Sequence, residues 1–170
     1  MPSGLRLQGN NDMDEALYNK VRDRLEALCA RQECCPSDIQ AKALKALGGD
    51  EAATSKLMSR LVEEKFIDPL RYACAFAREK SSLSGWGKVK ISYMLIRKGI
   101  ARDIVAQAVA DINEAKATEK LRSVAAAKYR LLKDDPMWRM KLLRYCLGRG
   151  YSYEETAAAI DSISEADAAE

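Results

Sequence analysis

The sequence predicts an all-α protein of three tandem three-helix repeats, stacked into an elongated, curved, right-handed or solenoid-like body without a sheet. Ala, Leu, Glu, Lys and Arg make up 85 of the 170 residues, a composition typical of helices. Val, Ile and Thr make up only 18, too few for a sheet protein. Gly48, Gly99 and Gly150 each follow an apolar helical pattern at intervals of 51 residues. Units of that length can hardly bury their own faces, so stacking would complete the core.

The first repeat is expected over residues 14–67, after a flexible N-terminal arm at 1–13 that shows no periodicity. Asp14 can cap a helix that runs to about residue 32, with apolar positions three and four residues apart. Ser37 or Asp38 can cap a second helix, which ends at Gly48. Asp50 then caps a third, which ends near residue 65.

The second repeat is expected over residues 68–114. It opens at Asp68-Pro69, a cap followed by a proline at the first helical position. This helix carries the aromatic side chains of Tyr72 and Phe76, four residues apart. The next helix ends at Gly99, and a third runs from about 101 to 113. The middle helix carries a wide apolar band, with Trp86, Val89, Tyr93 and Ile96 on one stripe and Ile91 and Leu95 beside it. So wide a band predicts burial against more than one neighbouring helix.

The third repeat is expected over residues 115–163, followed by an acidic tail at 164–170. A basic helix over 116–133 precedes Asp135-Pro136, which repeats the cap-and-proline start. The helix that follows ends at Gly150, and its expected core positions are Met140, Leu143 and Leu147. Ser152 and Glu155 have the spacing of a capping box for the last helix.

Apolar columns support the 51-residue register: Leu44, Leu95 and Cys146; Leu57, Ala108 and Ala159; Leu61, Ile112 and Ile163. We assign structural roles to seven residues: Gly48, Gly99, Gly150, Tyr72, Phe76, Ile91 and Leu95. Trp86, Tyr93 and Tyr151 are also expected in the core rather than on a base-stacking surface.

The composition argues against catalysis. The chain has no histidine, which removes imidazole bases, Ser-His and Cys-His pairs and imidazole metal ligands. The five cysteines lack paired zinc-ligand spacing, and adjacent acidic pairs do not share a helix face. We therefore expect a protein that is not an enzyme and has no catalytic residue, metal or cofactor. The odd cysteine count, with no apparent signal peptide, predicts reduced thiols in the cytoplasm.

The modest net charge of +3 hides a cationic middle and near-neutral ends. Residues 68–113 carry a net charge of +4, and 116–149 carry +7. Such a face could meet phosphate or an acidic protein surface. The candidate partner-binding basic residues are Arg71, Lys88, Lys90, Arg97, Lys98, Arg102, Arg139, Lys141, Arg144 and Arg149. The alternative for each is a solvated helix face, and Arg97, Lys98 and Arg149 also suit helix C-termini.

The second repeat carries a more specific pattern. Asp68 and Arg71-Tyr72-Ala73 precede Phe76, and Gly87 and Ile91 precede the stretch from Leu95 to Ile100, which reads LIRKGI. This pattern resembles the RecX family of bacterial recombinase regulators. The resemblance spans about 14–163, is weakest in the first repeat, and includes the third repeat's Arg149-Gly150-Tyr151. Cys146 departs from the usual leucine.

The resemblance implies a cytoplasmic negative modulator that binds the RecA–single-stranded DNA filament and inhibits its ATPase and strand exchange. Such a protein would regulate DNA repair, recombination and the SOS response. RecA would be the partner, contact with single-stranded DNA would be weak or indirect, and no membrane would be involved. The chain itself is expected to be a monomer. The alternatives are a stand-alone nucleic-acid-binding helical repeat and a generic helical adaptor between proteins.

Overall fold

The computed structural model describes the backbone of residues 6–169 and the side chains of residues 14–169. Within that part the chain forms nine α-helices and no strand, which confirms the all-α prediction. The chain divides into two compact units, residues 1–72 and 73–170.

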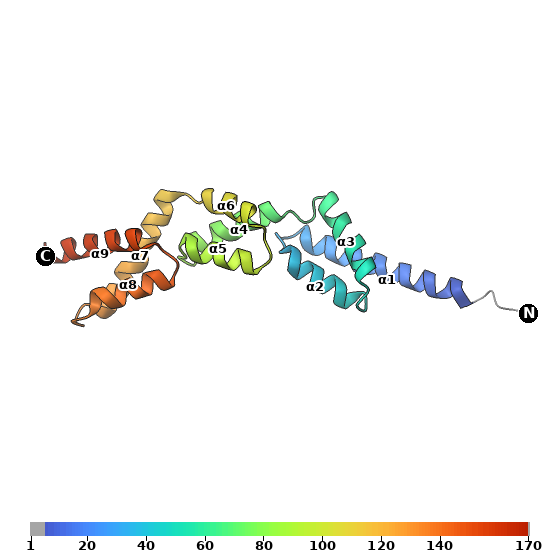
Figure 1. Cartoon of the computed structure of the whole chain (residues 1–170), viewed down its shortest axis with the longest axis horizontal. Helices are drawn as coiled ribbons and strands as arrows, with labels where there is room; N and C mark the ends of the chain where they lie inside the picture. Colours follow the sequence, from blue (N-terminus) through green and yellow to red (C-terminus); the bar gives the residue numbers. More distant parts are fainter. Residues whose placement is uncertain (1–5, 170) are drawn as a thin grey trace, which may run out of the picture. The chain divides into compact units, whose positions relative to one another are not determined.

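The first unit packs three helices around one apolar core: α1 (Arg6–Cys29), α2 (Pro36–Ala46) and α3 (Glu51–Glu63) (Figure 1). The core includes Leu25, Ile39, Leu57, Leu61 and Ile67. The expected cap of α3 is present, since Asp50 accepts a hydrogen bond from the Ala53 N–H at 2.9 Å. The capping prediction for α2 was wrong.

Helix α2 begins earlier than the sequence suggested, because a proline can occupy its first position. Its N-cap is Cys35, without a side-chain cap, and Pro36 follows. Proline has no N–H to satisfy there, and its fixed φ suits the first helical position. Neither Ser37 nor Asp38 is therefore the cap.

Helix α1 begins at Arg6, so most of the segment expected as a flexible arm is helical, and residues 1–5 lie outside the described residues. Extending an existing helix gains one hydrogen bond per residue ordered, whereas starting one is costly. The Gly and Asn residues that suggested an arm therefore do not stop a helix already formed from residue 14 on.

The remaining helices are α4 (Pro69–Ser82), α5 (Lys88–Arg97), α6 (Arg102–Ala110), α7 (Glu114–Leu132), α8 (Trp138–Gly148) and α9 (Tyr153–Ala168). Asp68 caps α4 by accepting from the Leu70 and Arg71 N–H groups, each at 3.0 Å. Ser152 and Glu155 form the expected capping box of α9. The expected acidic tail is helical as far as Ala168, and Glu170 lies outside the described residues.

Helix α8 starts later than the cap-and-proline pattern predicted. Asp135 accepts a hydrogen bond from the Met137 N–H at 2.8 Å, and the helix begins only at Trp138. Asp135 and Pro136 thus form a turn before the helix rather than its first residues. Asn113, which carried no expectation, caps α7 by accepting from the Lys116 N–H.

The 51-residue register holds at the ends of the middle helices α2, α5 and α8. Gly49, Ile100 and Tyr151 donate through their N–H groups to the carbonyls of Leu44, Leu95 and Cys146, at 2.8, 3.1 and 3.3 Å. The preceding residues Gly48, Gly99 and Gly150 have φ of +67°, +80° and +90°. Each helix therefore ends in the same left-handed motif, which glycine adopts without steric cost.

The core stripes of the middle helices differ from the prediction. Ile91 and Leu95 on α5 are fully buried, and so are their 51-residue equivalents Leu142 and Cys146 on α8. The predicted core residues Val89, Tyr93, Ile96, Met140 and Leu147 are exposed. Two apolar stripes lie side by side on each helix, and periodicity alone does not say which one faces the neighbouring helices.

Within the second unit, the end of α8 is hydrogen-bonded to the start of α5 (Figure 1). The Gly87 N–H donates to the Arg149 carbonyl at 2.8 Å, and the Val89 N–H donates to the Gly150 carbonyl at 3.1 Å. The Arg149 guanidinium donates to the carbonyls of Gly85, at 3.0 Å, and Ser84. We call this contact the α8–α5 joint.

The joint leaves no room for a side chain at two of its glycines. A Cβ on Gly87 would lie 2.1 Å from the Gly150 carbonyl oxygen, and one on Gly150 would lie 2.3 Å from the Lys90 Cβ. A Cβ on Gly99 would meet nothing within 4 Å. Glycine is therefore required at positions 87 and 150 because the two backbone segments of the joint approach each other closely there. At position 99 glycine is favoured only because φ is positive.

Alanine substitutions at these three glycines distinguish the cost of backbone strain from the cost of a steric clash. Gly99→Ala should cost about 1–2 kcal/mol, because only the left-handed conformation is strained. Gly87→Ala, at an ordinary φ of −78°, should cost more than Gly99→Ala because its Cβ would collide with backbone. Combining Gly87→Ala with Gly150→Ala should be less than additive, since both break one joint. Urea unfolding measures these three variants and Gly150→Ala alone, and a Gly87→Ala protein as stable as the Gly99→Ala protein would contradict the geometry of the joint.

Arg149→Lys should lower the free energy of unfolding by about 1–3 kcal/mol, because a lysine cannot span both carbonyls and charged hydrogen bonds contribute about that much. Arg144→Lys, on the same helix and exposed, is the matched control and should stay within about 0.5 kcal/mol of the parent protein. Thermal and urea unfolding of the two variants test this. Equal stabilities would mean that the Arg149 bonds contribute nothing.

Candidate interaction surface

Four of the candidate basic residues form ion pairs. Lys88 on α5 pairs with Glu114 and Lys141 on α8 pairs with Asp135, while Arg139 pairs with Asp161 on α9 at 3.1 Å. Arg71 in the first unit pairs with Glu33 and also donates to the Lys65 carbonyl. These pairs are partly or largely exposed, and such pairs contribute little to stability, so a partner can compete for the cations.

Two further candidates lie over aromatic rings. The Lys90 ammonium is 4.4 Å from the centroid of the Trp86 ring, and the Lys80 ammonium lies 5.6 Å from the same ring. The Arg97 guanidinium is 5.8 Å from the Tyr93 ring. Both aromatic residues were expected in the core. Trp86 is half-buried, but Tyr93 is exposed, so the prediction is wrong for Tyr93. Tyr151 is buried as expected, and burial raises its pKa to about 12.

The other candidates differ in their access to solvent. Arg102 and Arg144 are exposed, and neither has a partner among the described residues. Lys98 is half-buried at the C-terminal end of α5, where helix carbonyls and the helix dipole favour a cation. The Arg149 guanidinium is hydrogen-bonded within the α8–α5 joint, so we assign this residue a structural role instead of a partner contact. The sequence pattern does not reveal these hydrogen bonds, because the acceptors of Arg149 lie more than sixty residues earlier.

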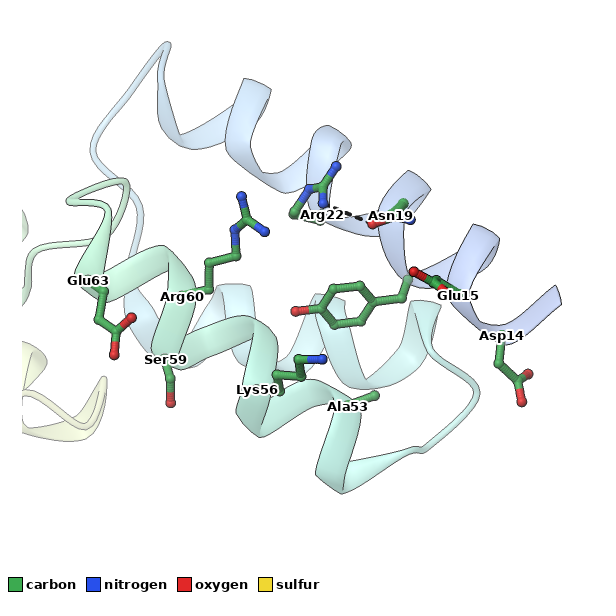
Figure 2. Close-up of a pocket in the computed structure, with 10 residues that line it drawn as sticks. Asp14, Glu15, Asn19, Arg22, Ala53, Lys56, Ser59, Arg60 and Glu63 are labelled. Atoms are coloured by element: carbon green, nitrogen blue, oxygen red, sulfur yellow. Dashed lines mark hydrogen bonds between the residues drawn. The ribbon is translucent and has the colours of Figure 1, made fainter. Parts of the chain in front are cut away.

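The first unit contains an open groove of about 940 Å³ between α1 and α3 (Figure 2). Arg22 from α1 and Lys56 and Arg60 from α3 line it, together with three carboxylates. Arg22 donates to Asn19 at 2.8 Å and to Asp23, and Arg60 pairs with Glu64 at 3.0 Å. The charges of the groove balance, so it offers no anion site, and it holds no nucleophile with an adjacent base.

The described residues show no cluster of metal ligands, and two of their cysteine thiols have a raised pKa. They contain no group of three or more His, Cys, Asp or Glu side chains placed to hold a metal ion. Burial and the neighbouring Cys34 thiol raise the pKa of the Cys29 thiol to about 12, and burial raises the pKa of Cys146. Because the thiolate is the reactive form, a raised pKa disfavours reaction of these two thiols at neutral pH. No described helix is both long and apolar enough to cross a bilayer.

Two family models, several curated proteins and two solved structures that are similar to this chain all belong to one family. Family models described as RecX, second and third three-helix domains, match residues 70–109 and 114–160. The chain is 30% identical over 122 residues to the regulatory protein RecX of Clostridium beijerinckii, covering 69% of this chain and 56% of that protein. It is also 30% identical over 114 residues to the regulatory protein RecX of Chlorobium phaeobacteroides, and this match covers 66% of this chain and 74% of that protein.

Solved structures agree on the fold. The crystal structure of RecX from Lactobacillus salivarius has a TM-score of 0.77 at 20% identity, covering 88% of this chain and 98% of that one. A second crystal structure of a regulatory protein RecX has a TM-score of 0.79 at 20% identity, covering 95% and 81%. The matches to several curated clostridial relatives span only about half of their length. This chain belongs to the RecX family, because it matches two RecX domain models, has the RecX fold and aligns with 74% of the length of a relative that is 30% identical.

Proposed function

We propose that this protein is a negative modulator of the RecA recombinase. It binds the RecA filament on single-stranded DNA, slows ATP hydrolysis and strand exchange, and so regulates recombination, DNA repair and the SOS response. Membership of a family of regulatory proteins is the observation that carries the proposal. Its RecA-specific part comes from the resemblance of the second repeat to RecX proteins.

The arrangement of side chains supports binding rather than catalysis. The described residues offer exposed cations and apolar side chains, and they contain no group of three or more side chains placed to hold a metal ion. We therefore propose a cytoplasmic, monomeric protein that is not an enzyme and acts by occupying a partner's surface. Eight candidate cations of the second unit are its contacts: Lys88, Lys90, Arg97, Lys98, Arg102, Arg139, Lys141 and Arg144.

Purified protein added to its cognate RecA should lower the rate of single-stranded-DNA-dependent ATP hydrolysis in a saturable manner. The effect should weaken as salt rises, since exposed charges are screened at higher ionic strength. A coupled ATPase assay measures the rate. An unchanged rate at saturating protein would contradict the proposed function.

Arg102→Glu with Arg144→Glu should raise the half-inhibitory concentration severalfold, because both cations are exposed and neither has an intramolecular partner among the described residues. Lys88 and Lys90 are less suitable, since changing them also disturbs Glu114 and Trp86. Arg102→Lys with Arg144→Lys is the control and should inhibit like the parent protein. Fluorescence anisotropy with labelled single-stranded DNA alone separates filament binding from stand-alone DNA binding, which would be tight and steeply salt-dependent.

A further inference from the structure

Two helices of the second unit expose the same apolar positions one repeat apart. Val89 on α5 is 64% exposed and its 51-residue equivalent on α8, Met140, is 47% exposed. Ile96 and its equivalent Leu147 are 39% and 40% exposed. We call each pair an outer stripe.

The fold does not require apolar residues at these positions. In the first repeat the equivalent residues on α2 are Asp38 and Lys45, both exposed. The same helix positions therefore accommodate an exposed charged side chain. Single exposed apolar residues are ordinary on protein surfaces, but the same pair exposed twice at equivalent positions indicates an interaction surface.

Cations flank each outer stripe in the same register. Lys88 and Lys90 on α5 correspond to Arg139 and Lys141 on α8, so Val89 and Met140 each lie between two cations along the helix. Tyr93, which is 58% exposed, extends the α5 stripe, and Arg144 takes its place on α8. An apolar centre with a basic rim complements an apolar patch rimmed by carboxylates. A phosphate backbone would use the cations but gain little from valine, isoleucine and methionine.

The α8–α5 joint holds the two stripes at a set spacing. Val89, the first residue of the α5 stripe, donates its N–H to the carbonyl of Gly150, three residues after Leu147. The α8 stripe therefore ends where the α5 stripe begins. Because backbone hydrogen bonds and two closely packed glycines hold this contact, little freedom is lost when both stripes are occupied together.

We propose that the two outer stripes bind equivalent apolar, acid-rimmed patches on two successive subunits of the RecA filament. This inference rests on the proposed function. Two similar stripes in one chain fit a partner that presents one surface repeatedly, as a polymer of identical subunits does. Joining two weak contacts raises the affinity for the polymer far above that for one subunit. The chain should therefore prefer filaments to free RecA.

The test places a negative charge on each stripe separately and together. Val89→Glu and Met140→Glu both fall in the first turn of their helices, where an acidic residue is favourable, so the fold should tolerate them. Each should raise the half-inhibitory concentration in the RecA ATPase assay by about tenfold or more, and the double variant should abolish inhibition. Leu131→Glu on α7, at an apolar residue 79% exposed and outside both stripes, is the matched control and should inhibit like the parent protein.

Val89→Ala with Met140→Ala removes apolar area without adding charge, and circular dichroism checks that every variant is folded. If the parent protein inhibits RecA and the stripe variants match Leu131→Glu, the stripe proposal is overturned and the proposed function stands. A parent protein that does not inhibit overturns both. Loss of single-stranded DNA binding without RecA would assign the stripes to DNA, and a dimer that Val89→Glu dissociates would assign them to a second copy; either result overturns the proposal.

Discussion

The pairing of two helix ends at the α8–α5 joint is the contact on which the arrangement of the second and third repeats depends. A helix start leaves N–H groups without intrahelical partners, and a helix end leaves carbonyls without them. Here the N–H groups of Gly87 and Val89 meet the carbonyls of Arg149 and Gly150, and the two dipoles are matched in sign. Arg149 adds charged hydrogen bonds to the preceding loop. Buried apolar area holds each repeat together, while this joint determines how the second repeat meets the third.

Much of the fold could be predicted from local chemistry. Caps at Asp50, Asp68 and Ser152 were predicted because the capping side chain and the amides it serves are at most three residues apart. The 51-residue spacing of helix-ending glycines predicted three repeats. The choice between adjacent stripes could not be predicted, because Val89 and Ile91 are equally apolar, and only the neighbouring helices decide which is buried. The start of α1 was missed because helix extension outweighs weak local propensity.

The candidate surface was only partly predictable, because contacts between residues far apart in the sequence decide which cations are free to bind a partner. The basic residues could be found in the sequence, but the sequence could not show that Arg149 binds loop carbonyls while Arg144 faces solvent. Most of the remaining cations lie in exposed ion pairs or over aromatic rings. A surface of this kind exchanges internal partners for external ones at little cost in free energy. It suits regulation by reversible binding better than permanent assembly.

The joint also has a consequence for the order of folding. Gly87 and its acceptor Arg149 are 62 residues apart in the chain, whereas the caps and glycine stops join residues at most five apart. Contacts of long sequence separation form late, because a long loop must close before they contribute. During synthesis the first amides of α5 emerge before their acceptors on Arg149 and Gly150 have been made, so the joint can form only after those residues have left the ribosome. The middle of this protein is therefore completed last, although the ribosome makes it before the third repeat.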